Sequence, residues 1–136
     1  MLPYFIFITC FFIALFDFCV MKFPIYLQII FLFLNVLYTI FKKFNILHCL
    51  LSSFVYFLLI CLISYFIKKY KKIDAIGDGD IKFMAIVGWT LGLGNIGAFY
   101  IISGFFGIIS SLFFKKTSRF PFIPSMIISY LFLLNL

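Results

Sequence analysis

Apolar runs follow one another along the whole chain, separated only by short clusters of Lys, Gly or Pro. Hydrophobic residues fill 66% of the 136 positions and charged residues only 11%, whereas a soluble domain carries about 25% charged residues. The runs are too rich in Phe, Ile and Leu for helices that lie on a membrane surface, and they lack the period-two alternation of barrel strands. The sequence therefore predicts an all-α, polytopic membrane protein with a single domain over residues 1–136.

Six transmembrane helices are expected, and the fourth is short. Its 13 residues rise only about 20 Å, less than the roughly 30 Å of bilayer hydrocarbon. Either the bilayer thins there, or the helix begins inside the protein with the glycine loop before it recessed among other helices. The first run lacks a basic segment and an A-x-A-like cleavage site, so we interpret it as a membrane helix rather than a signal peptide. The predicted spans are residues 2–16, 25–41, 46–67, 81–93, 96–114 and 121–136.

The positive charges predict the orientation. With the N-terminus outside, nine of the eleven basic residues face the cytoplasm, and only Lys42 and Lys43 lie outside. The positive-inside rule therefore predicts an N-out, C-out protein in the inner (plasma) membrane. The net charge of +7 then reflects helix ends that meet anionic lipid head groups, and no nucleic-acid-binding module accompanies it. Membrane lipids are expected partners and nucleic acid is not.

The four carboxylates are unevenly distributed. Three lie within residues 74–80, and the fourth is Asp17. Asp17 closes the first predicted span and Asp80 opens the fourth, so the chain crosses the membrane twice between them. Both carboxylates are therefore expected at the cytoplasmic face, and an ionisable residue at a membrane helix is by default a functional hypothesis.

Two carboxylates that converge suggest a definite chemistry. Close together they do not both ionise, so one can activate a water while the other protonates the leaving amine of a peptide. Gly77 and Gly79 are expected to adopt backbone conformations closed to other residues and to let a peptide approach Asp80. A position at a helix N-terminus would favour the charged form of Asp80. The pattern predicts the arrangement of an aspartic protease.

Plainer interpretations stay open for the same residues. A Gly-Asp-Gly-Asp stretch alone is usually a solvated turn before a helix, with an Asp as N-cap, and Asp17 could be an interfacial residue. Asp78 could raise the pKa of Asp80 by repulsion or could pair with Lys82. Calcium binding that includes Asp74 is not expected, because the spacing departs from an EF-hand loop. No metal or cofactor is predicted.

Glycines in the fourth and fifth spans suggest close helix packing. Gly88 and Gly92 form a GxxxG pattern on the fourth span, and three further glycines lie on the fifth. Small residues let membrane helices approach backbone to backbone. We therefore expect the fourth and fifth helices to pack against each other through these positions.

Three motifs resemble those of a known family. Residues 77–82, GDGDIK, resemble the GxGD motif, extended to GxGDxK, of type IV prepilin peptidases and the related archaeal preflagellin peptidases. Residues 17–24, DFCVMKFP, are similar to that family's first motif, in which an Asp ends the first helix and precedes an Ile-Pro pair. Residues 119–124, RFPFIP, look like its proline-containing lead into the last helix. The motif prolines are Pro24, Pro121 and Pro124.

The resemblance implies a six-helix membrane aspartic protease with Asp17 and Asp80 as the catalytic pair. Gly77 and Gly79 would shape the active-site loop. The substrates of the family are prepilin-like proteins whose short basic leader stays cytoplasmic and whose apolar helix lies in the membrane, and cleavage occurs at the boundary, usually after a Gly. The remaining candidate contacts to substrate or lipid are Asp78 and Lys82.

Larger bacterial members also methylate the new N-terminus and carry an added cytoplasmic segment, often with paired CxxC cysteines. This chain is shorter and its four cysteines form no CxxC. The resemblance therefore implies a minimal, peptidase-only form, like that of tight-adherence pilus systems, without N-methyltransferase activity. The alternative is a non-catalytic membrane protein: a degenerate relative that binds pilin-like helices, or a small transporter or assembly subunit. Convergence of the Asp17 and Asp80 carboxylates separates the two hypotheses.

Overall fold

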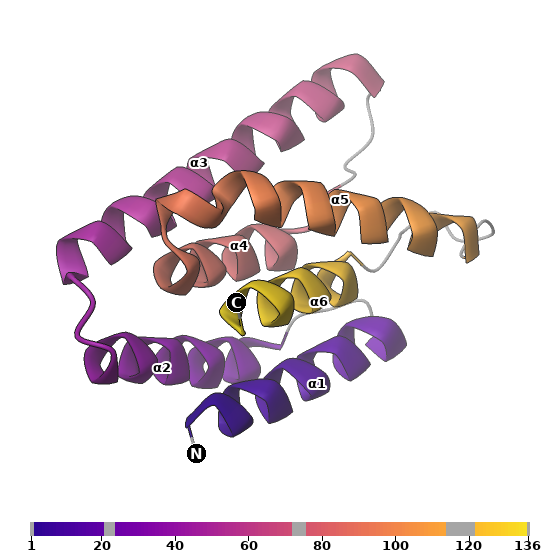
Figure 1. Ribbon diagram of the computed structural model, residues 1–136. Coiled ribbons are helices and arrows are strands. Elements are labelled where there is room, and N and C mark those ends of the chain that lie inside the picture. The colour runs from indigo at the N-terminus through magenta and orange to yellow at the C-terminus, as the bar shows by residue number, and fades with distance from the viewer. Residues whose placement is uncertain (1, 21–23, 72–75, 114–121, 136) are drawn as a thin grey trace.

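The computed structural model describes residues 2–20, 24–71, 76–113 and 122–135, and these residues are almost entirely helical, with no strand among them. The predicted all-α class is therefore confirmed for the described chain. The second helix has the predicted bounds, whereas the fourth begins three residues earlier than expected, at Asp78. The elements are α1 (Leu2–Val20), α2 (Ile25–Phe41), α3 (Ile46–Lys71), α4 (Asp78–Leu91), the 3-10 turn η1 (Leu93–Asn95), α5 (Ile96–Phe113) and α6 (Ile123–Leu134) (Figure 1).

The helices alternate in direction through the bundle (Figure 1). The last residues of α1, α3 and α5 and the first residues of α2, α4 and α6 lie toward one end of the molecule. The start of α1 and the end of α6 lie toward the other end. This order brings the last turn of α1, which contains Asp17, and the first turn of α4, which contains Asp80, to the same end of the bundle.

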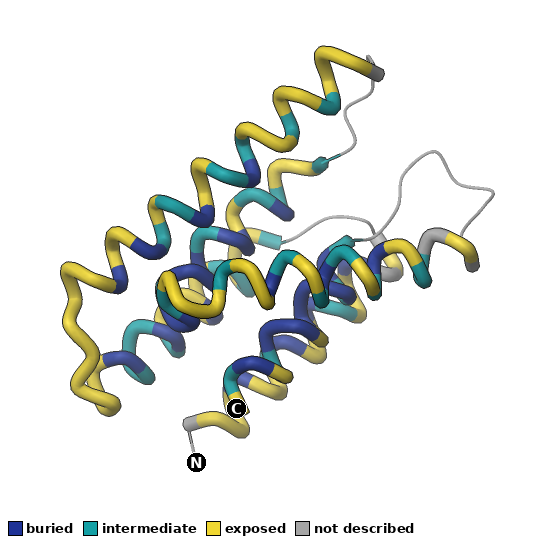
Figure 2. Tube along the Cα trace, turned by 45° about the horizontal axis from the view of Figure 1, so that its top comes forward, coloured by how far each residue is buried: buried dark blue, intermediate teal, exposed yellow. Residues whose placement is uncertain are grey.

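The surface of the bundle is apolar. Exposed residues run along the outer sides of the helices, above all on α3 and α5 (Figure 2), and they include many Phe, Ile and Leu side chains. Asn35, Ser52 and Ser129, by contrast, are fully buried. Apolar residues outside and polar residues inside are the pattern of a protein whose solvent is lipid.

Two described segments, Ile46–Tyr70 and Leu93–Ser110, are long and apolar enough to cross a membrane. Three shorter apolar helices accompany them, Pro3–Asp17, Ile25–Phe41 and Ile123–Leu134. The helices lie where the sequence analysis expects them, while the crossing of the bilayer by all six stays a prediction.

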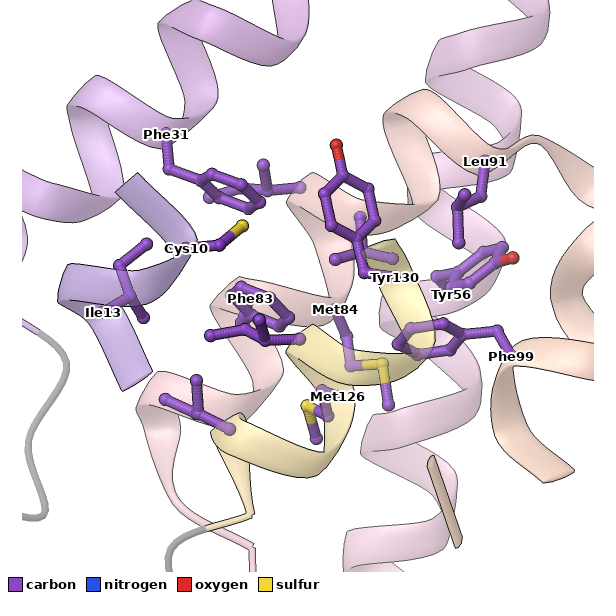
Figure 3. Packing of buried hydrophobic residues seen from close by; sticks show 14 of the residues in the cluster. Cys10, Ile13, Phe31, Tyr56, Phe83, Met84, Leu91, Phe99, Met126 and Tyr130 are labelled. Carbon is purple, nitrogen blue, oxygen red and sulfur yellow. The ribbon is translucent and has the colours of Figure 1, made fainter. Parts of the chain in front are cut away.

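Aromatic rings and methionines fill the space between α2, α4 and α6 (Figure 3). Phe31 of α2 stacks on Phe83 of α4 with ring centroids 5.2 Å apart, and Tyr130 of α6 meets Phe31 edge-on at 5.7 Å. Met84 and Met126 are fully buried in the same cluster. Stacked and edge-on aromatic pairs stabilise such a core beyond their buried area, so α4 and α6 hold the centre of the molecule.

A buried polar cluster joins the same three helices. The Asn35 side chain on α2 accepts hydrogen bonds from the hydroxyls of Thr90 on α4 and Tyr130 on α6, and it donates to the Phe31 carbonyl at 2.7 Å. Hydrogen bonds between helices in a membrane contribute about 0.6 kcal/mol each on average. The cluster therefore fixes how the three helices are rotated against each other.

The expected packing of the fourth helix on the fifth is wrong. Gly88 of α4 lies against Tyr56 of α3, since a Cβ added at Gly88 would lie 2.7 Å from the tyrosine ring. Ser52 and Ser53 of α3 donate hydrogen bonds to the carbonyls of Gly88 and Ala85, at 2.6 and 2.7 Å. The small residues of α4 therefore serve its contact with α3. Of the glycines on α5, Gly97 and Gly104 have no atom within 4 Å of an added Cβ, and Gly107 lies against Phe122.

Candidate active site

Asp80 lies in the first turn of α4, and the residues before it hold its carboxyl in place. The backbone N–H of Gly77, the N-cap residue, donates a hydrogen bond to Asp80 Oδ2 at 3.1 Å. An acidic residue three positions after the N-cap commonly makes this bond, which is half of a capping box. Gly77 has no side chain to make the other half. Asp80 is thereby held against the helix start and is only 9% exposed.

Gly77 and Gly79 do not supply the unusual backbone conformation that the sequence analysis expects. Gly77 has φ −78° and ψ 157°, which is extended backbone open to any residue, and Gly79 lies within α4. Among the described residues the glycine with positive φ is Gly92, after the end of α4. A Cβ on Gly77 would lie 3.7 Å from Asp80 Oδ2, an ordinary contact. What Gly77 provides is the backbone N–H that holds the Asp80 carboxyl.

Asp17 reaches from the last turn of α1 to the start of α6. Its side chain is only 6% exposed, and the backbone N–H of Ile123 donates a hydrogen bond to its carboxyl. Ile123 is the first residue of α6, where a backbone N–H has no partner within the helix. Asp17 Oδ2 is the buried side-chain oxygen that has no hydrogen-bond partner among the described residues. Because an unpaired buried carboxylate is costly, this oxygen favours a proton.

The two carboxyls influence each other's protonation. The Asp17 and Asp80 carboxyls lie just outside the predicted membrane spans, which are residues 2–16 and 81–93. Burial raises the pKa of Asp80 to about 7, the Gly77 N–H opposes the rise, and the charge of Asp17 adds to it. Burial likewise raises the pKa of Asp17 to about 6, against the lowering effect of the Ile123 N–H. Burial therefore outweighs the helix-terminus effect expected for Asp80, and the pair is close enough for its charges to interact.

Asp78 and Lys82 flank Asp80 on α4 but do not share its surroundings. Asp78 is the first residue of the helix and is exposed. Lys82 is also exposed, and it lines a groove of about 340 Å³ between α2, α3 and α4, together with Ser53 and Trp89. Both side chains are thus exposed, unlike the buried carboxyl pair.

Of the motif prolines, two lie at helix starts. Pro24 is the N-cap residue of α2, with φ −66° and ψ 137°, and Pro124 lies in the first turn of α6, next to the N–H that Asp17 binds. Proline suits these positions because its missing N–H needs no partner in the first turn. Pro121 and Asp74 are outside the described residues.

A cavity of about 300 Å³ lies beside Asp80, between α3, α4 and α5. Asp80 forms part of its wall, and most of the rest is apolar. Sequence reasoning missed this feature. The sequence indicates the cavity only through two small residues, Ser103 and Gly104, among the bulky residues of α5. These two residues do not indicate which helices lie opposite them.

Comparison with known proteins gives the family. The model of the type IV leader peptidase family matches residues 4–112, a segment that includes both Asp17 and Asp80. A prepilin leader peptidase/N-methyltransferase of Vibrio cholerae serotype O1 is 26% identical over 85 residues, which cover 60% of this chain and 34% of that relative. The matched segment thus spans about a third of the relative's length. No solved structure is significantly similar to the chain.

Proposed function

Because the chain belongs to the type IV leader peptidase family, we propose that it is an aspartic endopeptidase that removes the basic leader from type IV prepilin-like proteins. Asp17 and Asp80 are its catalytic pair. The observation that carries the proposal is that two carboxyls 63 positions apart in the sequence are both buried at one end of the bundle and interact through their charges. A lipid-exposed apolar bundle has no structural need for such a pair.

The proposed reaction needs one proton on the pair. The ionised carboxyl removes a proton from water while the water oxygen attacks the carbonyl carbon of the scissile bond. The protonated carboxyl donates its proton to the carbonyl oxygen. When the tetrahedral intermediate collapses, the carboxyl that is now ionised takes a proton from one hydroxyl of the intermediate, the C–N bond breaks, and the leaving nitrogen takes a proton from the other carboxyl. The pair again holds one proton. The products are a leader with a new carboxylate and a mature protein with a new amino group.

We further propose that the protein spans the inner membrane six times with both termini outside, so that the carboxyl pair lies at the cytoplasmic side. The alternating helix directions support this topology (Figure 1), and so does the excess of Lys and Arg expected at that face. A basic leader held in the cytoplasm and an apolar helix held in the membrane would present their junction at this level.

The test is cleavage of a candidate prepilin by the chain in membranes, compared among three matched Asp→Asn variants. Asn keeps the size of the side chain and removes the titrating carboxyl. Asp17→Asn and Asp80→Asn are each expected to lower cleavage on the order of 10³-fold or more, because the two groups act as a unit. Asp78→Asn is the control, since Asp78 is exposed and only two residues from Asp80.

Variants are compared at equal accumulation in the membrane. Cleavage that persists in Asp17→Asn or Asp80→Asn contradicts the dyad. If the wild-type chain cleaves none of several prepilins, the non-catalytic alternative replaces the peptidase. The mass of the product also tests whether the new amino group carries a methyl group. We propose that it does not, because these 136 residues hold no CxxC pair.

A further inference from the structure

The cavity between α3, α4 and α5 adjoins the proposed reaction site directly. Asp80 belongs to its wall, and Ile60 of α3 and Met84 of α4 supply apolar surface. Its volume of about 300 Å³ is at the lower limit of ligand pockets, which range from about 300 to 1,000 Å³. The space therefore suits one or two side chains of a peptide rather than a whole helix.

The chemistry of the wall selects the kind of side chain. Moving a Lys or Arg charge from water into a mostly apolar cavity is costly unless the charge is paired. Asp80 is the one carboxyl among the described residues of the wall, and the proposed reaction already uses it. A basic leader residue is therefore disfavoured in the cavity, and an apolar side chain from the other side of the cleaved bond is favoured.

Gly104 is a residue of the cavity wall that has no side chain. A Cβ added there meets no atom within 4 Å, so a side chain at this position can extend without disturbing the helix. Gly107, one turn further along α5, differs because its Cβ would lie 2.5 Å from Phe122. The backbone of α5 at Gly104 thus leaves space that a larger residue would take up.

We infer that this cavity receives the apolar side chain next to the scissile bond of the substrate, and that Gly104 determines how large that side chain can be. The inference rests on the proposed peptidase function. It gives Gly104 a role in specificity, whereas Asp17 and Asp80 perform the chemistry. Filling the cavity therefore changes which substrate is cleaved without removing the catalytic pair.

The experiment compares two prepilins that differ only in the apolar residue beside the cleaved bond, Leu in one and Ala in the other. For each variant the measured quantity is the ratio of kcat/KM for the Leu substrate to that for the Ala substrate. In the wild type this ratio is expected to exceed one, on the order of tenfold, as apolar pockets discriminate. Gly104→Leu is expected to bring the ratio to one or below.

Gly97→Leu is the matched control. Gly97 lies on the same helix and its added Cβ also meets nothing within 4 Å, but it does not line the cavity. Its ratio should equal that of the wild type. Gly104→Ala, a smaller change, is expected to give an intermediate ratio, and it carries the test if Gly104→Leu fails to accumulate.

The outcomes separate this inference from the proposed function. If Gly104→Leu or Gly104→Ala cleaves both substrates with the wild-type ratio, the specificity role is wrong and the peptidase stands. A wild-type ratio of one, or an equal change in Gly97→Leu, overturns the role as well. If the wild type cleaves neither substrate, the peptidase function itself fails, and the inference with it.

Discussion

At the level of single residues, burial decides the acid–base properties of the site. Asp80 caps α4 through the Gly77 N–H, a contact that favours the carboxylate, yet the surrounding apolar side chains raise its pKa to about 7. Asp17 also accepts a hydrogen bond from a backbone N–H, and burial also raises its pKa, to about 6. Each hydrogen bond therefore positions its carboxyl, while the loss of water around both keeps a proton on the pair near neutral pH.

The first prediction concerns the pH dependence of cleavage. Below about pH 6 both carboxyls are protonated and no base is present, and above about pH 7 both are ionised and no acid is present. We therefore expect a bell-shaped dependence of kcat/KM with its maximum between these two values. The measurement is initial rates in detergent or nanodiscs across this range. A maximum in the region of ordinary Asp titration, near about pH 4, would contradict the role of burial.

The second prediction isolates the Gly77 N–H. Gly77→Pro removes this donor at a φ of −78°, close to the value that proline imposes. Because the N–H lowers the pKa of Asp80, its loss should raise that pKa and move the alkaline side of the pH profile to higher pH. Gly77→Ala keeps the N–H and fits sterically, so its profile should match that of the wild type. If the pH profile of Gly77→Pro is not shifted, the hydrogen bond from the Gly77 N–H does not affect the pKa of Asp80.

At the level of helices, the contact between α3 and α4 determines where Asp80 sits. It combines a small residue, Gly88, with two serine hydroxyls that donate to carbonyls of α4. The glycine pattern could be predicted from the sequence, but its partner could not. A GxxxG pattern requires only that some helix comes close, and here Ser52 and Tyr56 of α3 fill that place instead of the glycines of α5.

The third prediction tests this helix contact. In Gly88→Ala the new Cβ would lie 2.7 Å from the Tyr56 ring, so α3 and α4 must separate or Tyr56 must change rotamer. Overpacking of this kind costs about 1–3 kcal/mol, and we expect the free energy of unfolding to fall by that amount. Gly97→Ala adds the same methyl group to a helix with no atom nearby. Comparable stability of the two variants in denaturant titrations would argue against a tight contact.

For the whole molecule, the order of the helices could be predicted from the sequence, whereas the contacts that enclose the site could not. The apolar runs, and the short Lys, Gly and Pro clusters between them, predict six helices. Their order places Asp17 and Asp80 at the same end of the bundle. The partner of Asp17, the Ile123 N–H on α6, lies 106 positions away, and no local pattern links the two residues. The cavity beside Asp80 likewise needs three helices to exist. The hydrogen bond to Asp17 and the cavity both depend on contacts between helices that are distant in the sequence, so only the folded structure reveals them.

The last prediction concerns orientation in the membrane. Asp78 is exposed at the end of the bundle that holds the carboxyl pair, and Asn135 is exposed at the opposite end. In a chain whose four cysteines are replaced by serine, Asp78→Cys and Asn135→Cys would report each end through a membrane-impermeant maleimide. If the basic loops face the cytoplasm, Asn135→Cys is labelled in intact cells and Asp78→Cys only in inside-out vesicles. The reverse pattern would put the carboxyl pair outside, away from a cytoplasmic leader, and labelling of both from one side would contradict a six-span topology.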